Sequence, residues 1–254
     1  MRIDLPTRRL RSLLMLAVTL VATAGLTAEV ARLGFEVENG EYVSEVFSLS
    51  QEGNFPTWFS GGLHLLAALL LCLVALGTKQ SGGPYVRHWA FLAFAFFYIS
   101  LDEVVTIHEK LNHVFDLGGA LFFSWILFAG VVVLLLGLSY RTFLQHLTPP
   151  IRRGFVLAGA VFITGAMLME IPLGLWFEAH GEDNIGYMLI DWVEETLEMV
   201  GISLFICSVF AHLGGSEGRL QILQCTVRSD AAAAPHPAAK RQLVSPALGD
   251  RMLS

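Results

Sequence analysis

The chain has 254 residues, of which 54% are hydrophobic and only 15% are charged, with a formal net charge of −6. In soluble domains about a quarter of the residues are charged, so this composition excludes an ordinary soluble domain and predicts an integral membrane protein. We expect the lipid bilayer to be its principal partner and expect no nucleic-acid partner.

Six stretches are long and apolar enough to cross about 30 Å of hydrocarbon, which takes about 20 helical residues. They cover Ser12–Gly34, Thr57–Gly77, Trp89–Ile107, Leu117–Leu138, Gly154–Phe177 and Met188–Leu213. Strands of membrane barrels alternate apolar and polar residues, whereas runs such as LFFSWILFAGVVVLLLGL are apolar on all sides. The predicted fold is therefore all-α, a polytopic transmembrane bundle of about six spans over residues 1–215, followed by a disordered cytoplasmic tail over residues 216–254.

Positive charge indicates the orientation of this bundle. With the amino terminus inside, all of the 16 Lys and Arg residues except Arg32 and Lys110 lie on the cytoplasmic side, as the positive-inside rule requires. We therefore expect both termini in the cytoplasm and a multi-pass protein of the bacterial inner membrane. All but four of the 22 Asp and Glu residues then fall in the outer loops or the outer halves of the spans.

Two local patterns predict further structure. The first outer loop has apolar residues near helical spacing, which predicts a short interfacial helix around Tyr42 to Leu49. Pro56 predicts the start of the second span, Pro149 and Pro150 predict a turn before the fifth span, and Pro172 predicts a kink within it.

Ionisable side chains gather in the outer half of the predicted bundle. An ionisable group at the bilayer centre costs at least about 2.5 kcal/mol, so such groups normally face the bundle interior or a wet cavity. At about 100° per residue, Asp102, Thr106, Glu109 and His113 share one stripe, provided that the third span continues as a helix past the membrane surface. In the sixth span Asp191, Glu195 and Glu198 form a second stripe, with Glu194 at its border.

Two acidic stripes in a low-dielectric layer repel one another unless protons or a cation lie between them, and only Arg32 and Lys110 are near enough to help. Mixed carboxylate and imidazole ligands suit zinc, iron or manganese, so we expect a divalent transition metal. The expected metal ligands are Asp102, Glu109, His113, Glu170, Glu195 and Glu198. The expected catalytic residues are His108, Glu103 and Glu194. Such a metal would activate water or dioxygen in a hydrolase or oxidoreductase that acts on a lipid or a periplasmic small molecule.

Other interpretations of the same residues stay open. The carboxylates could be the coupling site of a proton- or cation-coupled transporter, or they could only stabilise an accessory or scaffold subunit. Acids near the start of the sixth span are also favoured by the helix dipole. Glu29 and His64 could simply hydrogen-bond to neighbouring helices, and the third span could end near Leu101. Whether the protein is an enzyme, and its oligomeric state, are left undetermined.

Two stretches carry a resemblance to known proteins. The runs EGNFPTWFSGGLHLLAALLL and FYISLDEVVTIHEKL resemble a group of uncharacterised bacterial polytopic membrane proteins, over about a quarter of the chain. Asp102 and His108 also match the Asp-x5-His element of the alkaline ceramidase and adiponectin-receptor-like hydrolases, which implies a zinc hydrolase. The later His-x3-His pair of that superfamily is absent here, where the sixth span offers acids, and that superfamily has seven spans.

Overall fold

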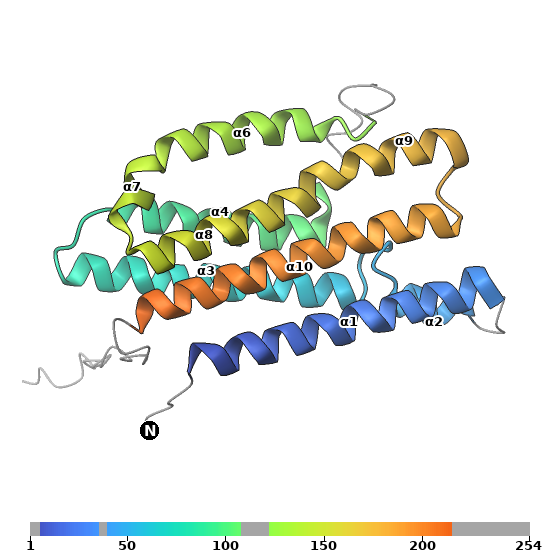
Figure 1. Ribbon diagram of the computed structural model, residues 1–254, viewed down its shortest axis with the longest axis horizontal. Helices are drawn as coiled ribbons and strands as arrows, with labels where there is room; N and C mark the ends of the chain where they lie inside the picture. Colours follow the sequence, from blue (N-terminus) through green and yellow to red (C-terminus); the bar gives the residue numbers. More distant parts are fainter. Residues whose placement is uncertain (1–5, 36–39, 108–121, 215–254) are drawn as a thin grey trace, which may run out of the picture. The chain divides into compact units, whose positions relative to one another are not determined.

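The computed structural model describes residues 6–35, 40–107 and 122–214, and in these ranges every regular element is a helix (Figure 1). The predicted all-α class is therefore confirmed. The elements are α1 (Thr7–Phe35), α2 (Gly40–Phe47), α3 (Phe55–Gln80), α4 (Val86–Val105), α6 (Trp125–Ser139), α7 (Arg141–His146), α8 (Pro149–Ile163), the π-helix η2 (Thr164–Met169), α9 (Glu170–His180) and α10 (Ile185–Leu213). The predicted tail over residues 216–254 lies outside the described residues.

Among the described residues, five helical segments are long and apolar enough to cross a membrane. They are Thr7–Leu33, Phe55–Gln80, Val86–Val105, Pro149–His180 and Ile185–Leu213. The fourth predicted span corresponds to α6, which is apolar but has only 15 residues, or about 22 Å at 1.5 Å per residue. The first residues of that predicted span, 117–121, lie outside the described ranges. The chain thus forms a helical membrane bundle.

Local sequence signals determine where several helices begin. Asn54 caps α3, because its side chain accepts a hydrogen bond from the Thr57 backbone N–H at 3.2 Å, and Pro56 lies in the first turn, where no backbone N–H is needed. Pro149 and Pro150 lie in the first turn of α8, which begins without a side-chain cap. The short helix predicted in the first outer loop is present as α2.

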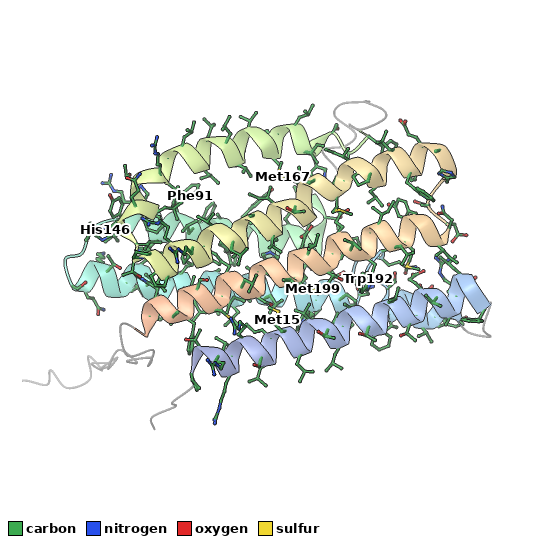
Figure 2. All side chains as sticks on the ribbon, in the orientation of Figure 1. Met15, Phe91, His146, Met167, Trp192 and Met199 are labelled. Carbon is green, nitrogen blue, oxygen red and sulfur yellow. The ribbon has the colours of Figure 1, made fainter. Side chains whose placement is uncertain are left out.

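Helix α10 is the centre of the bundle and packs along α1, α3 and α8. In Figure 1 it runs between α1 and the continuous segment formed by α8, η2 and α9. Trp192 of α10, labelled in Figure 2, ties α10 to α1, because its indole N–H donates to the Ala22 carbonyl at 2.8 Å. Helix α4 packs mainly along α3.

The third predicted span differs from the structure at its outer end. Helix α4 ends at Val105, and Thr106 adopts a left-handed conformation with φ of 53°. The N–H of Thr106 donates to the Asp102 carbonyl at 2.6 Å and closes the last turn. A left-handed residue turns the chain away from the helix axis, so α4 does not continue through Thr106 as predicted. Glu109 and His113 of the predicted stripe lie outside the described residues.

The fifth predicted span is interrupted, but the irregularity lies before Pro172 and not at the proline itself. The π-helix η2 separates α8 from α9 immediately before Glu170. Pro172 has no N–H to donate to the preceding turn, and this freedom favours a local change of helical register. π-Bulges often occur at functional sites, and here the bulge adjoins the acidic residues of α10.

Candidate functional site

Carboxylates from three elements gather beside the amino-terminal half of α10. We define the carboxylate cluster as Glu103 of α4, Glu170 of α9, and Asp191, Glu194, Glu195 and Glu198 of α10. Glu198 interacts electrostatically with both Glu103 and Glu170. Glu194 interacts with Glu170, and Glu195 with Glu103. The fold therefore brings together five of the nine predicted site residues, and Asp191 joins them.

Three of the other four predicted site residues, His108, Glu109 and His113, lie outside the described residues. Asp102 is described and lies half-buried in the last turn of α4, where its carboxylate interacts with Tyr98. Asp102 and Glu103 are adjacent in the helix, so their side chains leave it about 100° apart around the axis.

Close backbone packing presses η2 onto the acids of α10. A Cβ atom at Gly165 would lie 2.8 Å from the Glu194 carbonyl oxygen and 2.9 Å from Glu198 Cγ. Only glycine allows this approach, and small residues are the usual means by which membrane helices come together. Sequence reasoning missed Gly165, because a glycine in an apolar helix carries no signal of what it faces.

The buried Glu170 carboxylate connects the cluster to α6. Its Oε1 accepts a hydrogen bond from the indole N–H of Trp125, at 2.8 Å. Glu170 is 7% exposed, so its carboxylate is shielded from solvent. Trp125 was also missed, since the pairing joins residues on two different helices and neither residue alone predicts it.

Replacing Trp125 with phenylalanine is expected to lower the free energy of unfolding by about 1–3 kcal/mol, because the buried Glu170 oxygen loses a donor. Thermal unfolding of the detergent-purified protein measures the effect. Trp58→Phe is the matched control, because Trp58 is 68% exposed and its loss should change stability by no more than about 0.5 kcal/mol. Equal effects of the two substitutions would contradict the assignment.

The nearest described basic side chain is already engaged. Arg32 forms ion pairs with Glu29, at 3.0 Å between Nη2 and Oε2, and with Asp183, at 2.8 Å between Nη1 and Oδ1. The other oxygen of Glu29 accepts a hydrogen bond from the Ser44 hydroxyl of α2. Glu29 therefore joins α1 to α2 as a satisfied structural carboxylate, and it leaves Arg32 unable to neutralise the acids of α10.

Several polar atoms of α3 and α10 are buried and have no hydrogen-bond partner within the part of the chain that the structure describes. They are Ser60 Oγ, His64 Nε2, Asp191 Oδ2, Glu194 Oε2, Thr196 Oγ1 and Ser203 Oγ. Buried polar atoms normally have partners, so a group of such atoms indicates an ion, a proton or water that completes the site.

The ligand geometry of a metal is not preformed in this cluster. Within residues 6–35, 40–107 and 122–214, no three His, Cys, Asp or Glu side chains lie close enough together to hold a metal ion. Two of the predicted ligands, Glu109 and His113, fall outside these ranges. The described carboxylates can provide negative charge and oxygen ligands, but their side chains would have to move closer together to coordinate an ion.

Comparisons with known proteins place the chain in a family. Residues 11–213 match the model of a family described as a domain of unknown function, DUF8692. No curated protein and no solved structure matches the chain. The match begins within α1 and ends at the last residue of α10, so it covers all of the described helices except the first four residues of α1, and it includes the carboxylate cluster. The chain therefore belongs to the DUF8692 family.

Proposed function

We propose that the protein is a multi-pass protein of the bacterial inner membrane whose carboxylate cluster binds a divalent transition metal ion in the outer leaflet. Six spans, with α6 as the fourth, and both termini in the cytoplasm are the topology that the distribution of Lys and Arg supports. In this orientation the cluster lies toward the periplasmic side of α10.

One observation carries the metal proposal. Asp191 and Glu194 each keep a buried carboxylate oxygen without a hydrogen-bond partner among the described residues, and both face further acids. Buried charges of one sign need a compensating positive charge. Arg32 is already paired with Glu29 and Asp183, so a bound cation is the simplest means of compensation.

Carboxylate and imidazole ligands suit zinc, iron or manganese. In the proposed site Asp102, Glu109, His113, Glu170, Glu195 and Glu198 supply the ligands, and His108, Glu103 and Glu194 assist catalysis. A metal there would activate water against a lipid or a periplasmic small molecule. The partial resemblance to alkaline ceramidase-like hydrolases, through Asp102 and His108, is in line with this chemistry.

Metal content tests the proposal. We expect protein purified in detergent without added metal to contain a transition metal in stoichiometric amount, and we expect a Glu170→Gln, Glu198→Gln variant to lose it. Elemental analysis measures both. A Glu41→Gln, Glu45→Gln variant is the matched control, because these two acids are exposed on α2 and should leave the metal in place. Metal-free wild-type protein would overturn the proposal.

A proton- or cation-coupled transporter is the second candidate. Among the described residues no three-ligand group for a metal is preformed, which favours this candidate. A proton on Asp191 or Glu194 would neutralise the carboxylate and turn its unpartnered oxygen into a hydrogen-bond donor, and no side chain would have to move to coordinate an ion. Against it, the other half of the bundle core is filled by apolar residues such as Leu71, Val74 and Ile206, which offer no polar path. Metal-free wild-type protein that takes up protons would favour this candidate.

A further inference from the structure

The end of the bundle opposite the carboxylate cluster carries positive charge that no described acid balances (Figure 1). Every described Asp and Glu residue lies toward the other end. Among the described residues only Arg32 forms ion pairs with acids. All other described Lys and Arg residues lie at this end, and they are Arg8, Arg9, Arg11, Lys79, Arg87, Arg141, Arg152 and Arg153.

Two consecutive helices at this end form a corner of basic side chains. We define the basic corner as Arg141 and His146 of α7 and Arg152 and Arg153 of α8. The two helices are joined by a short connection, because α7 ends at His146 and α8 begins at Pro149. Arg152 is half-buried and the other three side chains are exposed. The corner therefore presents guanidinium and imidazole groups at the surface of the protein.

Ring contacts hold α7 in place against α4. Phe143 of α7 is 1% exposed, and its ring centroid lies 4.7 Å from that of Trp89 and 5.7 Å from that of His88. The Tyr140 hydroxyl, immediately before α7, donates to the His88 carbonyl at 2.9 Å. Because α7 is fixed in this way, a ligand of the basic corner would not have to order the helix that binds it.

The surroundings of His146 favour a negative ligand. His146, labelled in Figure 2, has its ring centroid 5.1 Å from that of Tyr85. The charged forms of His146 and His212 of α10 repel one another, and an anion beside them would relieve this repulsion. Phosphate oxygens accept hydrogen bonds from both guanidinium and imidazole N–H groups. The basic corner thus has the donors that recognise a phosphate.

Exposed apolar side chains continue from the corner along the bundle. Val156 and Leu157 are 55% and 57% exposed, and they lie three and four residues after Arg153, on the same face of α8. Leu138 of α6, shortly before Arg141, is 65% exposed. A phospholipid needs both a contact for its headgroup and an apolar surface for its acyl chains, whereas free phosphate needs only the first.

We infer that the basic corner binds the phosphate headgroup of an anionic phospholipid of the cytoplasmic leaflet, and that the acyl chains lie along the exposed faces of α6 and α8. The inference uses the proposed orientation of the bundle but does not depend on the metal site. The positive-inside rule accounts for positive charge at this end, but it treats the arginines of α1 in the same way. The structure separates them, because α10 runs between α1 and α8 (Figure 1).

Lipid binding to the detergent-purified full chain, measured by native mass spectrometry, tests the inference. We expect the wild type to bind phosphatidylglycerol about tenfold or more tightly than phosphatidylcholine, because each Lys or Arg near an anionic headgroup changes the affinity about fivefold. For the same reason Arg141→Gln, Arg153→Gln should weaken phosphatidylglycerol binding about tenfold or more. Arg141→Lys, Arg153→Lys keeps the charge and should keep most of the affinity.

Arg8→Gln, Arg9→Gln is the matched control, because it removes the same charge from exposed residues at the same end of the bundle. It should bind phosphatidylglycerol as the wild type does. An equal loss of affinity in the two glutamine variants would show a general attraction to this end and overturn the inference. Equal binding of the two lipids by the wild type would also overturn it. Inorganic phosphate that displaces phosphatidylglycerol at equal concentration would assign the corner to free phosphate instead.

Discussion

Replacing Gly201 with alanine is expected to lower the free energy of unfolding by about 1–3 kcal/mol, because the added methyl group overpacks the contact between α10 and α8. A Cβ atom at Gly201 would lie 2.7 Å from the Phe162 backbone nitrogen and 2.8 Å from its Cα. These are backbone atoms, so the two helices must separate to accommodate the methyl group. The shift in the thermal unfolding midpoint in detergent measures the effect.

Gly159→Ala is the control for this prediction. Gly159 lies in the same helix as Phe162, and nothing lies within 4 Å of a Cβ atom placed there. Alanine favours a helix by about 1 kcal/mol over glycine, so this variant should be neutral or more stable. The two identical substitutions are thus expected to act in opposite directions. Stabilisation by both would show that α8 and α10 do not approach as closely as the structure indicates.

Replacing Arg32 with methionine is expected to cost about 3–5 kcal/mol, because it leaves the buried Glu29 carboxylate without its positive partner. The Glu29 side chain is 4% exposed and that of Arg32 is 26% exposed, so solvent screens the pair only weakly. The Ser44 hydroxyl bond to Glu29 remains in the variant, but one neutral donor does not balance a buried charge. Thermal unfolding in detergent measures the loss.

Two further variants separate this charge effect from the loss of packing. Asp183→Asn removes the other partner of Arg32, but the Asp183 side chain is 75% exposed, so the change should be no more than about 1 kcal/mol. A Glu29→Gln, Arg32→Met double variant removes the buried charge as well, and it should recover part of the stability. If the double variant were as unstable as Arg32→Met alone, the cost would come from packing and not from charge.

Much of the helical organisation is readable from local signals. Asn54 and Pro56 predict the start of α3, and the spacing of apolar residues predicts α2, because capping and amphipathicity act over only a few residues. The outer end of α4 was misread for the opposite reason. The run that follows Asp102 keeps a partly apolar helical period, but the left-handed turn at Thr106 depends on a single pair of backbone angles that no periodicity reports.

The candidate site was only partly predictable. Periodicity placed Asp191, Glu195 and Glu198 on one face of α10, and buried acids were expected to face the bundle interior. It could not show that Glu29 is satisfied by Arg32 and Ser44, nor that Glu170 pairs with Trp125. Each of these relations joins residues on separate helices or depends on how two helices are rotated against one another.

The sequence by itself determined that this chain is a helical membrane protein, the approximate positions of its spans and the concentration of acids toward one end of the bundle. These properties follow from the composition and from the helical periodicity of apolar residues, and both are averages over many residues. Only the tertiary structure decided which acids meet, because close contacts at Gly165 and Gly201 set the depth and rotation of η2 and α8 against α10. One methyl group at either contact is enough to change that packing, and no average over residues detects it.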